Sequence, residues 1–137
     1  MKTLVSPTSF GRALAIDGTP PGTRLGLDDP EPEWLAPLAG PVYPVYGQLY
    51  VIDGWRDRTQ QQPEIEFAFY SRRFTETERV ARAFEAYLMR YPVRVQVGEK
   101  LAVLDRAEVV TATREVPWDV DTSVTRFIGS YQLRTRS

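Results

Sequence analysis

Apolar and polar positions alternate with a helical period over residues 74–88, which read FTETERVARAFEAYL. Thr75 followed three residues later by Glu78 is typical of a capping box at the start of a helix. Pro92 prevents the helix from continuing. The apolar positions that recur every three or four residues are Val80, Ala83, Phe84, Tyr87 and Leu88. The pattern predicts one amphipathic helix.

Strict alternation predicts strands on both sides of this helix. Ile65, Phe67 and Phe69 fall on one face of the stretch EIEFAFYS, while Glu64 and Glu66 fall on the other. One face of that strand should be buried and the other at least partly wet, as in an antiparallel sheet. Further β-rich stretches occupy residues 42–53, 93–97, 101–116 and 124–136, with a bend expected near 105–106.

Residues 1–44 hold eight of the eleven prolines and five of the nine glycines. Proline fixes φ and removes a backbone donor, so we expect an extended N-terminal arm, with one short helical turn at 33–38. The arm would be anchored on its own domain or on a neighbouring subunit by Leu25, Leu27, Trp34, Leu35 and Leu38. The predicted organisation is an arm over 1–44 and a single domain over 45–137.

The expected elements follow the order arm, strand, loop, strand, helix, two strands, loop and strand. This order predicts an α+β fold, with a single mostly antiparallel sheet of four to five strands packed by one long helix. No second helix is expected to cover the opposite face of the sheet. That face would therefore be covered by the arm or by another subunit.

Composition excludes several kinds of chemistry. The chain has neither cysteine nor histidine, which removes disulfides, thiolate metal sites, cysteine nucleophiles and the commonest general base. It also has no phosphate-binding glycine loop and no hydrolase or metalloprotease motif. We therefore expect no enzyme activity, no catalytic residue, no cofactor and no bound metal. No run of about 18 apolar residues exists, so no membrane span is expected.

The net charge of −1 is unevenly distributed. Residues 1–66 contain five basic and nine acidic side chains, whereas residues 67–137 contain twelve basic and nine acidic ones. Such a gradient suits head-to-tail self-association, although random scatter over a solvated surface is an equally good explanation.

Two carboxylate pairs keep other interpretations open. Glu64 and Glu66 could serve a carboxylate-dependent metal nuclease, and Asp119 and Asp121 could hold a cation in a loop. Solvated surface explains both pairs more simply. A generic adaptor domain that recognises a peptide through a sheet edge is a further alternative.

Two polar loops, 53–63 and 117–123, carry tryptophans beside charged residues or proline. Exposed Trp and Arg are favoured interface anchors, whereas the alternative is that each Trp folds back onto the edge of the core. The candidate interface residues are Trp34, Leu35, Trp55, Arg56, Arg58, Trp118, Asp119, Arg134 and Arg136.

Several motifs follow one another between residues 45 and 136. They are the strand QLYVID, a polar loop, the strand EIEFAFYS, the helix TETERVARAFEAYL, the β-run LAVLDRAEVV, the loop VPWDVD and the strand TRFIGSYQLRTR. In order and spacing, this region resembles the tail terminator (tail completion) proteins of long-tailed bacteriophages. Members of that family usually open with a helix, whereas residues 1–44 are rich in proline and glycine.

The resemblance implies a structural virion protein of the tail or neck, assembled in the host cytoplasm. Family members form a hexameric ring that caps the tail tube, stops its polymerisation and joins the tail to the head connector. The implied partners are copies of the chain itself, the tail tube protein and the head–tail connector protein, with DNA only as cargo that passes through the lumen. Another head–tail connector or neck subunit is the alternative within the same assembly.

Overall fold

The computed structural model describes residues 5–37, 42–56 and 60–136, although not the side chains at 53–56, 60–61 and 136. Within this part of the chain the helices are α1 (Pro7–Gly18), the short 3-10 helix η1 (Pro32–Leu35) and α2 (Phe74–Leu88). The strands are β1 (Arg24–Gly26), β2 (Tyr46–Arg56), β3 (Gln60–Ser71), β4 (Val93–Val97), β5 (Lys100–Glu115) and β6 (Thr125–Arg136).

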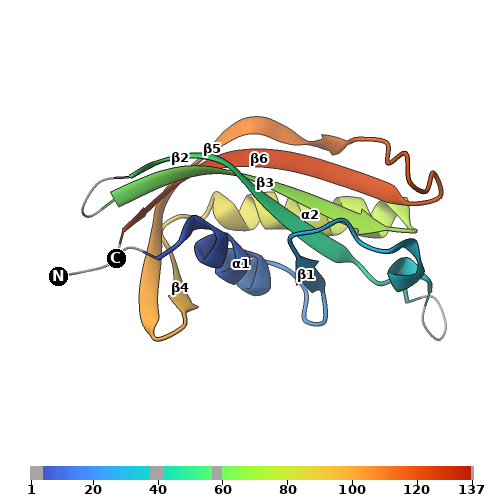
Figure 1. Ribbon diagram of the computed structural model, residues 1–137, viewed down its shortest axis with the longest axis horizontal. Coiled ribbons are helices and arrows are strands. Elements are labelled where there is room, and N and C mark those ends of the chain that lie inside the picture. The colour runs from blue at the N-terminus through green and yellow to red at the C-terminus, as the bar shows by residue number, and fades with distance from the viewer. Residues whose placement is uncertain (1–4, 38–41, 57–59, 137) are drawn as a thin grey trace.

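The strands form one curled sheet in the order β1-β2-β3-β6-β5-β4. β1 runs parallel to β2, whereas the other neighbouring pairs are antiparallel, so the sheet is mixed. Both helices lie under the same face: α2 packs against β3, β6 and β5, and α1 packs against β2 and β4 (Figure 1). The curl brings β4 down beside α1, at the opposite edge of the sheet from β1.

The predicted fold class was wrong in its number of elements. The described residues contain six strands and two α-helices, where four to five strands, one long helix and an N-terminal arm were predicted. Helix α1 and strand β1 both lie within residues 1–44, and Val5, Phe10 and Leu14 are buried in the main core. The N-terminal region therefore completes the sheet and covers it.

Helix α1 can form with a proline because that proline lies at its N-terminal end. Pro7 occupies the first turn, where its missing N–H needs no partner. Ser6 caps the helix, since its Oγ accepts the Ser9 N–H at 3.1 Å. At the other end the Thr19 hydroxyl donates to the Ala15 carbonyl at 2.6 Å. The helix is thus closed at both ends by side-chain hydrogen bonds.

The main core lies between the sheet and the two helices. Ile65, Phe67 and Phe69 are buried on the helix-facing side of β3, as predicted. The Phe84 ring of α2 packs at 4.6 Å from the Phe67 ring and 5.5 Å from the Phe69 ring, measured between centroids. At Gly18 a Cβ atom would lie only 2.6 Å from Tyr87, so the absence of a side chain lets the two helices approach.

The predicted helix is confirmed as α2, but its predicted cap is wrong. The N-cap position is Arg73, and no side chain caps the helix there. Thr75 lies inside the first turn. The Thr77 hydroxyl instead donates to the Arg73 carbonyl at 2.9 Å and shares a hydrogen bond with the Ser71 hydroxyl at 2.6 Å. A buried hydroxyl pair therefore joins the end of β3 to α2.

The polar segment 53–63 was predicted as a loop, but strands enter it from both sides. β2 continues to Arg56 and β3 begins at Gln60. Pro63 has no partner on β6, although Gln61 and Glu64 do. Its missing N–H therefore leaves no hydrogen bond to β6 unmade, and the proline is tolerated within β3. The bend expected near 105–106 is confirmed by a shift of the β5–β6 register between Leu104 and Arg106.

The opposite face of the sheet is covered at one end only. There, η1 and the loop 116–124 enclose a second apolar cluster, which comprises Leu35, Tyr46, Ala68, Tyr70, Trp118 and Val124. Elsewhere the face is open, and Tyr50 on β2 is 63% exposed.

Candidate functional site

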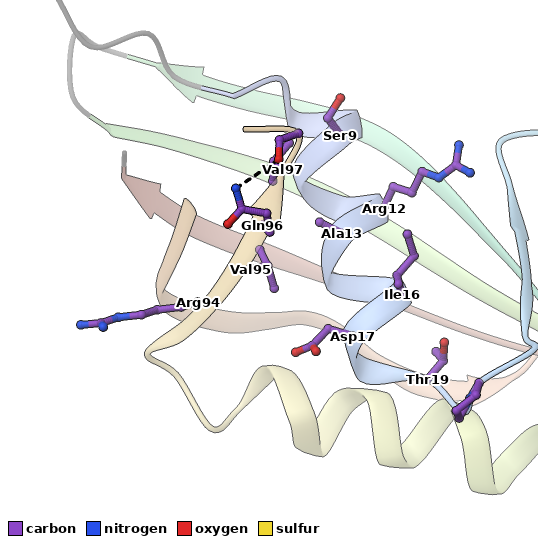
Figure 2. A pocket seen from close by; sticks show the side chains of 12 residues that line it. Ser9, Arg12, Ala13, Ile16, Asp17, Thr19, Arg94, Val95, Gln96 and Val97 are labelled. Carbon is purple, nitrogen blue, oxygen red and sulfur yellow. Dashed lines mark hydrogen bonds between the residues drawn. The ribbon is translucent and has the colours of Figure 1, made fainter. Parts of the chain in front are cut away.

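A groove separates helix α1 from the edge strand β4 (Figure 2). It encloses a volume of about 810 Å³. Its walls are formed by Ser9, Arg12, Ala13, Ile16, Asp17, Thr19, Pro21, Arg94, Val95, Gln96, Val97 and Gly98. The groove is therefore bounded by one helix, one strand and the turns that follow them.

The groove is apolar along its length. Val95 of β4 is buried at its base, while Ile16 of α1 is 59% exposed beside it. β4 turns into β5 through Gly98, whose φ of +60° is a conformation that favours glycine. The Gln96 amide donates to the Gly98 carbonyl at 3.1 Å and holds that turn (Figure 2). The arrangement offers an aliphatic surface next to a strand at the edge of the sheet.

The charges of the groove are predominantly positive. Arg12 on α1 and Arg94 on β4 extend to opposite sides of it (Figure 2), and neither guanidinium has a polar partner among the described residues. Asp17 is already engaged, because its carboxylate accepts the Tyr87 hydroxyl at 2.7 Å. Burial, and then that hydrogen bond to Asp17, raise the pKa of Tyr87. The groove thus keeps two uncompensated arginines.

An acidic segment follows β1 near the other end of the molecule. Asp28, Glu31 and Glu33 are exposed there. Hydrogen bonding with Glu33, and then its negative charge, raise the pKa of Glu31. Nearby, the Arg24 guanidinium stacks 3.6 Å from the centre of the Trp34 ring. The segment carries several negative charges, and the positive charge of Arg24 partly offsets the rise in the pKa of Glu31.

A smaller hollow of about 280 Å³ lies on the open face of the sheet, beside the second apolar cluster. Its polar groups are largely bonded to one another. The Tyr70 hydroxyl donates to Gln48 at 2.6 Å, and the Gln48 amide donates to Asp29 at 3.0 Å. The Arg126 guanidinium donates to the Pro117 carbonyl at 2.7 Å. These bonds hold the covering loops on the sheet.

The structure places the predicted interface residues in different settings. Trp34 is half-buried, with its ring centroid 5.9 Å from that of Tyr46. Leu35 and Trp118 are buried in the second cluster, so Trp118 folds back onto the sheet, which was one of the two alternatives for it. Asp119 is exposed.

Of the remaining predicted residues, the structure describes the side chain of Arg134. Arg134 is partly buried opposite Arg106, and its Nε has no hydrogen-bond partner. The structure does not describe the side chains of Trp55, Arg56 and Arg136, and it describes no part of Arg58. Of the described candidates, Trp34, Leu35 and Trp118 therefore come together at the second cluster, whereas Arg134 lies apart from them.

The two carboxylate pairs are also placed. Among the residues that the structure describes, no group of three or more acidic side chains could hold a metal ion. The Asp121 carboxylate accepts the Ser123 hydroxyl at 2.7 Å and pairs with Arg72 at 3.1 Å. Those contacts, led by the hydrogen bonds from Ser123, lower the pKa of Asp121. Asp121 therefore ties the loop to the end of β3.

Sequence reasoning missed the groove because it missed α1. Arg12 and Ile16 lie four residues apart, on the face of α1 that turns away from Phe10 and Leu14. Once a helix is assigned to 7–18, that spacing is a detectable signal. The contribution of β4 is not detectable in this way, since it depends on the curl of the sheet.

Comparison with the models of known protein families and with curated proteins finds no match. None of the helices in the described ranges is long and apolar enough to cross a membrane.

Proposed function

We propose that this protein is the ring-forming subunit of a tail terminator, which caps the tail tube of a long-tailed bacteriophage and joins it to the head connector. The observation that carries the proposal is the order of the elements: α1, then β1 and η1, the β2–β3 pair, α2, the β4–β5 pair and β6. Helix α1 supplies the opening helix that members of the family usually have. A helix in the part of the chain that departed from the resemblance in its composition supports the proposal.

The surface supports assembly from identical copies. A closed ring needs a heterologous interface, in which one patch meets a different patch on the next subunit. The groove at β4 carries two arginines without a polar partner among the described residues, whereas the segment after β1 carries four carboxylates with Arg24 nearby. β1 and β4 are the first and last strands of the sheet, so the two patches lie at its opposite edges.

The open face of the sheet supports contacts with other tail or neck components. Tyr50 is 63% exposed and Ile52, at the register shift of β2, is 46% exposed. Large apolar side chains that gather at an uncovered surface are typical of protein contacts. We assign this face to the partner that meets the ring, either the tail tube or the connector.

The test is the length of tails made in the absence of this protein. If it terminates the tube, deletion of its gene from the phage that encodes it should give overlong tube polymers in electron micrographs, and the purified protein should restore normal length. Tails of normal length that fail to join heads would contradict termination and support the alternative of a connector subunit. Normal virions would contradict both.

A further inference from the structure

We infer that the groove between α1 and β4 receives residues 27–33 of the next copy of the chain. The inference rests on the proposed function, because a closed ring requires one such contact per subunit. It goes beyond that proposal by naming the two surfaces that meet. The groove supplies an apolar floor and two arginines, and the segment LDDPEPE supplies one exposed leucine and four carboxylates.

The apolar parts of the two surfaces match. Leu27 is 57% exposed although it directly follows β1, and Ile16 is 59% exposed at the rim of the groove. Each side chain has a charged neighbour in the sequence: Asp28 follows Leu27, and Asp17 follows Ile16. Inserting Leu27 between Ile16 and Val95 would remove both exposed side chains from water in one contact.

The charges of the two surfaces also match. Arg12 and Arg94 lie on opposite rims of the groove, and their side chains point outward, away from each other (Figure 2). An occupant of the groove would therefore meet a positive charge at each rim. In the segment, the carboxylates of Asp28 and Glu31 are separated by two residues. An arginine beside Glu31 would offset the repulsion that Glu33 now exerts on it. Electrostatic complementarity of this kind sets orientation as well as attraction.

The groove and the segment that meet must belong to different copies of the chain, because within one copy these two surfaces lie apart. In Figure 1, α1 lies between β4 and β1, and the segment after β1 continues away from α1 towards η1. The groove opens on the β4 side of α1. One subunit therefore presents the groove at one edge of the sheet and the segment at the other. The segment is hydrogen-bonded to its own β2 through the carbonyls of Leu27 and Asp28, while its Leu27, Asp28 and Glu31 side chains are exposed.

A charge-exchange experiment tests this contact. Variant R12E/R94E has acidic side chains on both the groove and the segment. Variant D28R/E31R has arginines in the groove and at positions 28 and 31, and its segment has a net charge of zero. Each alone should self-associate about tenfold more weakly than the parent, as measured by analytical ultracentrifugation at low salt. An equimolar mixture should regain association, because each pair of groove side chains can then meet a pair of opposite charge at positions 28 and 31. The fourfold variant should assemble alone.

The exchanged positions are suited to this use because all four side chains are exposed. Circular dichroism should give unchanged spectra for every variant. R114E, which reverses an exposed arginine on β5 outside the groove, is the matched control and should leave association unchanged.

Engineered disulfides give an independent test, since the chain has no cysteine of its own. A mixture of I16C and L27C should yield a cross-linked pair on mild oxidation. The control pairs I16C with V120C, which is 64% exposed in the loop 116–124, and should not cross-link above background.

The outcomes separate the inference from the proposed function. Oligomers that survive R12E/R94E, together with no selective cross-link, would overturn this contact and leave ring assembly standing. A parent chain that stays monomeric but gives the selective cross-link would support the contact and contradict the ring. A monomeric parent with no selective cross-link would overturn both.

Discussion

The two faces of the sheet are covered in different ways. One face is packed along its length by α1 and α2, and its core is almost entirely apolar. Within the described residues, the other face is covered only at one end. There, η1 and the loop 116–124 pack on the sheet through the second apolar cluster and through the ion pair between Arg72 and Asp121. We infer that the helix-covered face stabilises the fold, and that the open face and the two sheet edges are available for assembly.

Phe84→Ala breaks the helix-covered face and should have the largest effect. Phe84 is fully buried and contacts both Phe67 and Phe69. Truncation should lower the free energy of unfolding by about 3–5 kcal/mol, through lost transfer energy and the cavity left behind. Urea denaturation followed by circular dichroism measures this. A loss below about 1 kcal/mol would contradict the assignment of the main core.

Trp118→Ala breaks the second cluster and should cost less, about 2–3 kcal/mol, because a loop at the surface can collapse into the space. Trp118 is 4% exposed and packs edge-on against Tyr70, with ring centroids 5.1 Å apart. Hydrogen exchange should show faster exchange in the loop 116–124 and unchanged protection in α2. V120A, in the same loop, should change neither. Loss of protection in α2 would show that the two faces form one cooperative unit.

Tyr131→Phe sharpens the comparison by removing a hydrogen bond between β6 and α2 on the helix-covered side. The Tyr131 hydroxyl donates to Glu85 of α2 at 2.9 Å and shares a hydrogen bond with Thr113 at 2.6 Å. The variant should lose about 1 kcal/mol, since the Thr113 hydroxyl, released from Tyr131, can then donate to Glu85. A double-mutant cycle with Thr113→Val measures the coupling. A zero coupling energy would mean that the tie contributes nothing to the packing of α2.

Asp121→Asn should have the smallest effect and should depend on pH. The lowered pKa of Asp121 means that its carboxylate stabilises the fold above the ordinary carboxyl pKa, and that this stabilisation is lost as the pH falls through the lowered value. The variant should melt below the parent at pH 7 and together with it in strong acid. Thermal melts at several pH values measure this, and a gap that persists in strong acid would contradict the assignment.

The sequence was sufficient where one physical signal dominated. Ile65, Phe67 and Phe69 alternate strictly, because one side of β3 meets the helices and the other side does not. α2 was equally detectable, since Val80, Phe84 and Leu88 return to the core at each turn.

Helix α1 was not predicted because its own residues favour it weakly. Gly11 lies in its middle, and a Cβ atom there would be 3.1 Å from the Ile65 side chain, so close packing against the sheet favours glycine, which is a weak helix former. The groove could not be predicted for the same reason. It exists only because tertiary contacts hold α1 next to β4, which is distant in the sequence.

The central claim is that copies of this chain close into a ring through two different surfaces. The mass of the purified protein in solution, measured by native mass spectrometry over a range of concentrations, tests it most directly. We predict a single closed oligomer of fixed subunit number, with six implied by the resemblance, that dissociates in R12E/R94E. A chain that stays monomeric at the highest concentration, or that grows into open polymers of no fixed size, would contradict the claim.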